Sequence, residues 1–259
     1  MKSGKTLKAV MISHAHPDHF IGLDVITERF PEAQVVSTQN VVTDIKTDGP
    51  WTFSMLQGKL GPEGPTRLVV PKPLSEPVLV IEGGKLDVVE FGEGESKHIA
   101  SVYIPSERAL LSADLVYNKA HLYLQERHLE SWLARLDELE AFAKDRVSTI
   151  YPGHGAGGDL TLIAQTRSYL HDFADAVKSG DAKTALYVLP RGDAVPKDAT
   201  KRLFFADELT KGAIVWSKPH LLEACANSTY PRGQVPISSL LKKPVFRVPG
   251  SKFPVIAVL

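Results

Sequence analysis

Hydrophobic and polar positions along the chain form short blocks that predict strands and helices in turn. The apolar run KAVMIS, residues 8–13, stops at a polar cluster, which is typical of a buried strand that ends in a functional loop. In DHFIGLDVITERF, apolar side chains recur at helical spacing until Pro31 ends the pattern. QVVST then predicts a strand, and Thr38 is placed to cap a helix through QNVVTDI.

The middle of the chain predicts an antiparallel meander. VLVIEGGKLDVVEFG has the pattern of a hairpin divided by Gly83 and Gly84, and HIASVYIPSERALLSADLVYN adds two strands that turn at PSER. Before this meander, residues 47–77 are rich in Gly and Pro and predict a loop with a short embedded helix. Long loops of this kind often border active sites, although a plain surface excursion explains the composition equally well.

Two amphipathic helices are expected after the meander. LESWLARLDELEAFAK places Trp132, Phe142 and several leucines on one stripe, and a further helix is expected from Asp159 to about Lys178. Between them, VSTIYPGHG repeats the opening pattern of a short apolar strand followed by a polar turn with a histidine. No period is recognisable beyond about residue 190, so we divide the chain into a domain of residues 1–178 and a C-terminal segment, residues 179–259, of unassigned role.

Composition limits the partners and the chemistry. Lys plus Arg and Asp plus Glu number 30 each, so the charge gives no reason to expect binding to nucleic acid or to a membrane surface. The sequence has no apolar run near the roughly 20 residues that cross a bilayer. The single cysteine, Cys225, excludes an intramolecular disulfide framework and a thiolate zinc cluster, and it favours a reducing compartment, so we expect a cytoplasmic protein. Any metal would be held by imidazole and carboxylate groups.

The most informative segment is H-A-H-P-D-H, which places His14, His16, Asp18 and His19 close together. The alternative is a surface loop whose histidines only form hydrogen bonds. That interpretation treats the motif as coincidence, but a chance match to H-x-H-x-D-H in this chain is expected well under roughly one time in a thousand. His14 and His16 alternate in an extended segment, so both imidazoles point to the same side and can share one ion. Asp18 and His19 face another direction as the chain turns into a helix, which suits a second ion.

Further ligands must come from other strand ends, because one loop cannot complete two coordination spheres. An aspartate after a strand is commonly a turn residue, and a histidine in a Gly-rich turn usually faces solvent. In their order and spacing, however, the candidates reinforce one another. These candidates are Asp114 in LLSADLVYN, His154 in STIYPGHG, and Glu95 and His98 in FGEGESKHIA.

Together these motifs resemble the metallo-β-lactamase superfamily of dinuclear metallohydrolases, over about residues 8–175. The elements H-A-H-P-D-H, the Gly-containing segment before VYIP, ALLSADLVY and YPGHG follow one another in the family's order. The resemblance implies an α+β fold, an αββα four-layer sandwich with the metals at one edge of the two packed sheets. It also implies two divalent metal ions, the first held by His14 and His16, the second by Asp18, His19 and His154, with Asp114 bridging them.

Two departures from the family pattern affect these implications. Where the family usually has G-H-T, alignment back from Pro105 places Gly94, Glu95 and Ser96, so Glu95 replaces the third histidine of the first ion, with His98 as the alternative. Carboxylate ligation is compatible with zinc, the metal that we expect, and makes manganese or iron relatively more attractive. Only about seven residues precede KAVMIS, so either the usual N-terminal strands of the first sheet are lacking or the C-terminal tail compensates for them.

The resemblance implies a hydrolase that acts on a small molecule. Two ions would activate a hydroxide near pH 7, which the catalytic residue Asp18 would orient. The fold alone does not choose among ester, lactone, thioester and related substrates. One alternative is a non-hydrolytic metal-binding relative that acts as a binding or regulatory protein, and another is a single iron that oxidises a thiol or persulfide. We expect substrate contacts from residues 47–77 and from the following side chains: Trp51, Lys97, His121, Tyr123, His128 and Tyr151.

Overall fold

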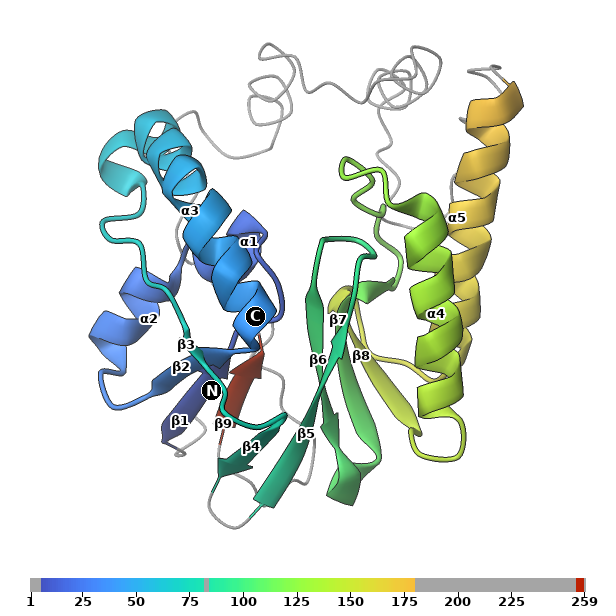
Figure 1. The fold of residues 1–259 in the computed structure, drawn as a ribbon, viewed down its shortest axis with the longest axis horizontal. Coiled ribbons are helices and arrows are strands. Elements are labelled where there is room, and N and C mark those ends of the chain that lie inside the picture. Colours follow the sequence, from blue (N-terminus) through green and yellow to red (C-terminus); the bar gives the residue numbers. More distant parts are fainter. Residues whose placement is uncertain (1–5, 82–83, 180–254, 259) are drawn as a thin grey trace.

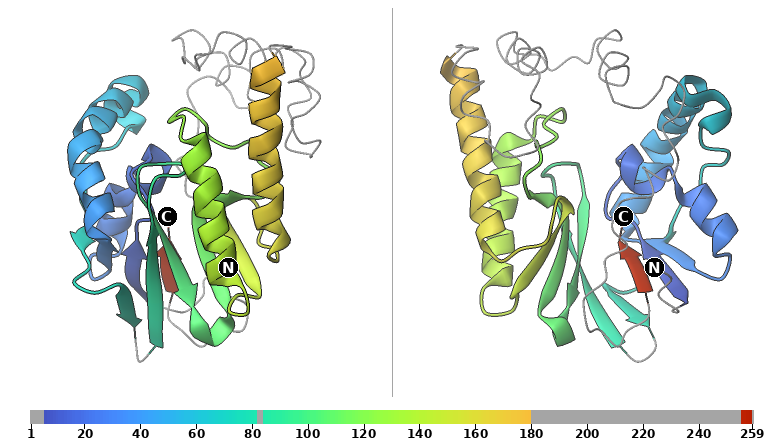
Figure 2. Two further views of the ribbon diagram at one scale, coloured as in Figure 1. Left: turned by 45° about the vertical axis from the view of Figure 1, so that its right-hand side comes forward. Right: turned by 180° about the vertical axis from the view of Figure 1, so that it is seen from behind.

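Two β-sheets pack against each other, and helices cover the outer face of each sheet (Figures 1 and 2). The structure is a computed structural model, and it describes residues 6–81, 84–179 and 255–258. Figure 1 shows helices α2 and α3 towards the left, helices α4 and α5 on the right, and the two sheets between them. The predicted αββα four-layer sandwich is therefore confirmed.

The first sheet has the strand order β3-β2-β1-β9, and its pairings are all parallel. Its strands are β1 (Leu7–Met11), β2 (Gln34–Ser37), β3 (Lys72–Pro73) and β9 (Val255–Val258). Strand β9 pairs with β1, as expected if the C-terminal tail contributes to this sheet. Residues 180–254 of the predicted C-terminal segment lie outside the described residues, so its boundary and the lack of N-terminal strands stay predictions.

The second sheet has the order β4-β5-β6-β7-β8, antiparallel as far as β7 and parallel between β7 and β8. The predicted meander is therefore confirmed, and PSER forms the 3-10 helix η2 (Pro105–Glu107) at its turn. Every residue of β7 is buried, because the first sheet covers one of its faces and helices cover the other. The strands are β4 (Val78–Ile81), β5 (Gly84–Phe91), β6 (Ile99–Ile104), β7 (Ala109–Tyr117) and β8 (Thr149–His154).

The helices beside the first sheet differ from the prediction in two ways. The single helix expected before Pro31 is divided into α1 (Pro17–Phe20) and α2 (Leu23–Arg29). The loop expected over residues 47–77 is wrong in its first part, because α3 (Gln39–Leu60) continues through Pro50 and is followed by the 3-10 helix η1 (Gly61–Glu63). The Thr38 hydroxyl accepts a hydrogen bond from the Val41 N–H at 3.5 Å, as its predicted role as a cap requires.

Burial explains why α3 extends through a segment rich in helix-breaking residues. Its buried positions recur at helical spacing and make one continuous face against the core; they are Val41, Val42, Ile45, Gly49 and Thr52. A Cβ added at Gly49 would lie 3.5 Å from Phe20, Ile45 and Leu68, in ordinary van der Waals contact, so this position of the helix faces the core closely. Tertiary packing of this face therefore outweighs the local cost of Pro50.

Helices α4 (Leu129–Ala143) and α5 (Thr161–Ser179) cover the second sheet where the sequence predicts two amphipathic helices. In α4 the buried residues Trp132, Leu136 and Leu139 face the sheet, and the Trp132 indole N–H donates to the Leu115 carbonyl at 3.1 Å. In the part of the chain that the structure describes, no helix combines the length and apolar character needed to cross a membrane.

Leu136→Ala tests the packing of α4 on the second sheet. Leu136 has no exposed surface, so the truncation should lower the free energy of unfolding by about 2–5 kcal/mol through lost contacts and a cavity. Urea denaturation measures the change, with Leu60→Ala as the control because Leu60 is 41% exposed. Equal effects of the two substitutions would contradict the described packing.

Candidate metal centre

Backbone hydrogen bonds to both sheets hold the histidine loop that follows β1. The Ile12 N–H donates to the Val36 carbonyl at 3.0 Å, and the Ser37 hydroxyl donates to the Ile12 carbonyl at 2.6 Å. The Ala100 N–H of β6 donates to the Ser13 carbonyl at 2.7 Å. The loop is therefore fixed where the two sheets meet, and His14 is completely buried there.

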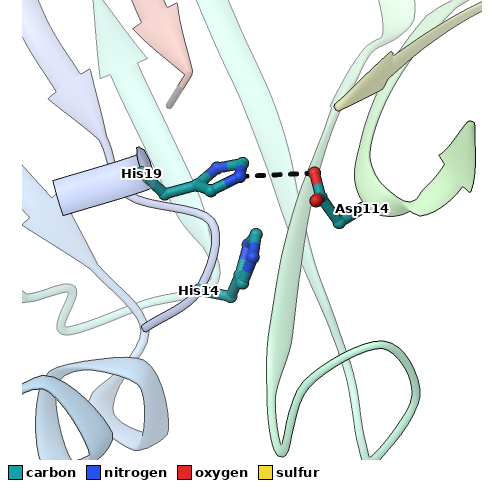
Figure 3. Close-up of side chains that lie close together, drawn as sticks. All are labelled: His14, His19 and Asp114. Atoms are coloured by element: carbon teal, nitrogen blue, oxygen red, sulfur yellow. Dashed lines mark ion pairs between the residues drawn. The ribbon is translucent and has the colours of Figure 1, made fainter. Parts of the chain in front are cut away.

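A bulge in β7 places Asp114 opposite this loop. Ala113 has a φ of 51°, in the left-handed region that residues other than glycine rarely adopt, and the pairing of β7 with β8 shifts register around it. Such bulges redirect side chains near functional sites. Figure 3 shows the result: the Asp114 carboxylate on β7 faces His14 and His19 across the gap between the two sheets.

His14, His16 and Glu95 form the first of three ligand groups. The Glu95 Oε1 atom lies 2.9 Å from His16 Nδ1, and the Glu95 Oε2 atom lies 3.4 Å from His14 Nε2. The two imidazole nitrogens lie 3.1 Å apart. Each side chain therefore offers one donor atom to a common point, as a metal ion requires.

Asp18, His19 and His154 form the second group. The Asp18 Oδ2 atom lies 3.5 Å from His19 Nε2 and 3.4 Å from His154 Nε2. Asp114 lies beside this second group, with its Oδ1 atom 3.4 Å from His19 Nε2 and its Oδ2 atom 3.1 Å from His154 Nε2. A third group consists of His14, His19 and Asp114. All seven predicted site residues thus form one continuous cluster.

Two buried carboxylate oxygens without hydrogen-bond partners indicate that the cluster fits metal ions. Glu95 Oε2 and Asp114 Oδ1 are both buried without a hydrogen-bond partner. Unsatisfied carboxylate oxygens are unfavourable in a protein interior, and a coordinated cation relieves this cost. The cluster's four imidazoles and three carboxylates are suitable ligands for zinc, and also for manganese or iron.

Two of the imidazoles, those of His16 and His19, carry positive charge that offsets the negative charge of the buried carboxylates. Burial lowers the pKa of His16, but hydrogen bonds and charges from Glu126 and Glu95 outweigh it and raise the pKa to about 10. Burial opposes the protonation of His19 too, yet Asp114 and Asp18 raise its pKa to about 9. Both rings are thus cationic at neutral pH when no metal is bound, and they would have to release protons to bind one.

For His14 and Glu95 the effect of burial on the pKa prevails, whereas for Asp114 the neighbouring histidines outweigh it. Burial, with the charge of His19, lowers the pKa of His14 well below its usual value, so this ring is a neutral ligand. Burial also raises the pKa of Glu95 to about 7, against the hydrogen bond from His16. Burial would raise the pKa of Asp114 as well, but His19 and the hydrogen bond from His154 hold it well below the usual range.

Comparison with known proteins identifies the family that uses this arrangement. A sequence profile of the metallo-beta-lactamase superfamily matches residues 2–154, a range that contains the whole cluster. The chain belongs to the metallo-beta-lactamase superfamily. Among curated proteins, no sequence matches it.

Solved structures of the metallo-beta-lactamase fold are similar to the chain at low sequence identity. A beta-lactamase domain protein from Burkholderia ambifaria is 20% identical, with a TM-score of 0.52 over 80% of this chain and 67% of that one. The protein VMB-1 is also 20% identical, with a TM-score of 0.50 over 65% of this chain and 69% of that one. At this identity the similarity establishes the fold alone.

In this metallo-beta-lactamase-fold chain, the structure separates the two candidates for the third ligand of the first ion. Glu95 lies in the first group, whereas His98 Nδ1 lies 2.7 Å from Asp44 Oδ2 on α3. His98 belongs to none of the ligand groups found among the described residues. Metal ligation by Glu95 stays a prediction, but the geometry favours it over ligation by His98.

The residues predicted to contact substrate lie in different surroundings. Tyr123 lies beside the cluster, with its ring 4.9 Å from that of His16. Trp51 projects from α3 and is 71% exposed, and Tyr151 packs against the core between the sheets. The other three have polar partners: His121 Nδ1 lies 3.0 Å from the Tyr169 hydroxyl, His128 Nε2 3.4 Å from Glu93 Oε2, and Lys97 Nζ 3.1 Å from Asp48 Oδ2.

Sequence reasoning missed three residues that contact the cluster. Ser13 Oγ lies 3.0 Å from His14 Nδ1 and 3.1 Å from His19 Nδ1, so one hydroxyl contacts a histidine of each group. Glu126 Oε1 lies 2.7 Å from His16 Nε2. The Tyr117 hydroxyl donates to Asp114 Oδ2 at 2.6 Å. Such partners orient metal ligands. Ser13 adjoins the histidine motif, but the contacts of Glu126 and Tyr117 depend on the tertiary fold.

Glu95→Ala and His98→Ala, compared side by side, test the third ligand of the first ion. Glu95→Ala should weaken the binding of one zinc ion by at least about tenfold, because it removes a buried carboxylate whose two oxygens face His14 and His16. His98→Ala should leave zinc affinity nearly unchanged. Titration of the metal-free protein against a chelator measures both, and a larger loss in His98→Ala would contradict the assignment.

Gly153→Ala tests whether β8 must approach Asp114 closely. An added Cβ would collide with the Asp114 carboxylate and would lie 2.9 Å from the Ala113 carbonyl carbon, so the carboxylate would be displaced. We expect Gly153→Ala to lose bound metal. Gly58→Ala is the matched control, since nothing lies within 4 Å of its added Cβ. Elemental analysis of both purified variants gives the comparison, and full metal content in Gly153→Ala would refute the described contact.

Proposed function

We propose that the chain is a metal-dependent hydrolase that acts on a small ester, lactone, thioester or related substrate. The observation that carries the proposal is the pair of ligand groups joined by Asp114, in which Glu95 and Asp114 each keep a buried oxygen without a hydrogen-bond partner. Two adjacent divalent ions would satisfy both oxygens. Membership of the superfamily supports the same chemical class.

The ligand groups define how this chain would hold the two ions. His14, His16 and Glu95 would hold the first ion, and Asp18, His19 and His154 would hold the second. Asp114 forms a third group with His14 of the first group and His19 of the second, so it would contact both ions. When bound, a pair of divalent ions lowers the pKa of water towards neutrality and polarises the carbonyl or phosphoryl oxygen of a substrate. We propose zinc, and the carboxylate in the first group also suits manganese or iron.

Asp18 is the carboxylate best placed to handle a proton. Its side chain is 41% exposed, whereas those of Glu95 and Asp114 are 1% and 2% exposed. It lies at the solvent side of the second group, within 3.5 Å of both His19 Nε2 and His154 Nε2. Asp18 would orient the attacking water and accept its proton, while the buried carboxylates hold the cluster together.

A second class of function would use the same metal centre. A metal-binding relative without hydrolytic activity, acting as a binding or regulatory protein, is favoured by one observation: a carboxylate, Glu95, completes the first group. The two functions differ in turnover but share the metal centre. A cytoplasmic location, favoured by the single cysteine, and a small-molecule partner are part of our proposal.

Metal content and hydrolysis, measured on the same samples, test the proposed function. Protein purified without added metal should contain about two divalent ions per chain, and His14→Ala should contain fewer, because His14 belongs to two of the three ligand groups. Elemental analysis gives the stoichiometry. Panels of ester, lactone, thioester and phosphoester substrates should then reveal turnover that a chelator abolishes and zinc restores.

The outcomes separate the two classes of function. Two ions per chain without turnover on any panel would favour the binding or regulatory relative. A folded sample with no bound metal, and none taken up on addition of zinc, would refute both.

A further inference from the structure

Tyr117 contacts three members of the ligand cluster with a single side chain. It is the last residue of β7 and only 5% exposed. Its hydroxyl lies 2.6 Å from Asp114 Oδ2 and 3.5 Å from Glu95 Oε1. Its ring stacks on the imidazole of His154, with centroids 5.1 Å apart and planes inclined by 21°. Tyr117 therefore touches residues assigned to the first ion, to the second ion and to the bridge between them.

The two contacts of the hydroxyl determine which way its proton points. A phenol hydroxyl has one proton to donate, and an ionised carboxylate oxygen only accepts hydrogen bonds. The contact with Asp114, at 2.6 Å, is shorter than the contact with Glu95, at 3.5 Å, so the hydroxyl donates its proton to Asp114. This hydrogen bond occupies Oδ2 and leaves Oδ1 of Asp114 buried without a hydrogen-bond partner, 3.4 Å from His19 Nε2.

The Tyr117 hydroxyl also affects the repulsion between Glu95 and Asp114. Glu95 and Asp114 are both buried carboxylates, and like charges repel each other strongly in a protein interior. The Tyr117 hydroxyl lies within 3.5 Å of an oxygen of each. A neutral donor between two buried carboxylates offsets part of their repulsion, and it does so without adding a charge that would compete with a metal ion.

We propose that Tyr117 is a positioning residue of the metal centre, whose hydroxyl fixes the rotamer of Asp114 so that Oδ1 is presented to the ions and whose ring fixes the plane of His154. The inference rests on the proposed function, since it takes the cluster to be a metal centre. It goes further by assigning a role to a buried tyrosine that is not among the seven predicted site residues.

Tyr117→Phe tests this role, because it removes the hydroxyl and keeps the ring that stacks on His154. Cobalt(II) is the probe, titrated into the metal-free full chain in competition with a chelator while its visible absorption spectrum is recorded. Tyr117→Phe should lower the affinity for at least one cobalt ion by about 10–100-fold and change the absorption bands, because Asp114 loses its fixed orientation.

Tyr169→Phe is the matched control for the loss of a buried hydroxyl. Tyr169 is 6% exposed, and its hydroxyl lies 3.0 Å from His121 Nδ1, outside the ligand groups. The cobalt affinity and the absorption spectrum of Tyr169→Phe should equal those of the unsubstituted chain. Urea denaturation of the metal-free proteins should give similar losses of stability for the two variants, which separates positioning of the ligands from a contribution to folding.

Each outcome decides between the proposals. Cobalt affinity and spectra unchanged in Tyr117→Phe would overturn the positioning role and leave the metal-dependent function intact. A loss of affinity that merely accompanies much greater unfolding than in Tyr169→Phe would overturn it as well, because the role would then be structural. An unsubstituted chain that binds no cobalt would overturn both the positioning role and the proposed function.

Discussion

The structure depends on holding three carboxylates and four imidazoles together at the line where its two sheets meet. Several of these groups are almost completely buried, and burying charge in a protein is costly unless opposite charges or a metal ion compensate for it. In the metal-free chain, protonated His16 and His19 provide that compensation beside Glu95 and Asp114. The balance is incomplete, since one oxygen of each of these carboxylates has no hydrogen-bond partner. A cation bound between the two carboxylates would satisfy both oxygens.

The layers around the cluster have geometric features that bring its members together. The loop after β1 is bonded to both sheets, β7 bulges at Ala113 to aim Asp114, and β8 approaches so closely at Gly153 that no side chain fits there. Gly155 follows with a φ of 99°, in a position where a Cβ would collide with the Asn118 carbonyl oxygen. These features cost local stability, and the two hydrophobic cores on either side of the second sheet hold them in place.

A fold shared at 20% identity does not carry a substrate with it, so function has to be argued from the site. The main departure from the family's usual pattern is Glu95, which makes the first group two imidazoles and a carboxylate. The residues around it, Tyr117 and Glu126, are polar and face the ligands directly. Selectivity among zinc, manganese and iron thus depends on the ligands together with the groups that orient them.

The sequence by itself determined the elements whose signal is local. Hydrophobic periodicity was sufficient to predict the meander and helices α4 and α5, because each of these elements buries one regular face. The spacing of H-A-H-P-D-H, with the later Asp114 and His154, was sufficient to predict which side chains come together. The strand end expected at Asp114 is wrong, because β7 continues to Tyr117 and its bulge at Ala113 aims the carboxylate instead. For Glu95 and His98, register alone left two choices open, because both residues lie just before the same strand.

Tertiary structure decided the features that depend on contacts between distant segments. Helix α3 continues past Pro50 because its buried face packs on the core, a gain that no local propensity contains. His98 turns to Asp44 while Glu95 joins His14 and His16, a choice made by the packing of α3 beside the loop. The contacts of Ser13, Tyr117 and Glu126 with the ligands likewise arise only when the sheets close on each other, because a side chain's partners across two sheets leave no periodic pattern in the sequence.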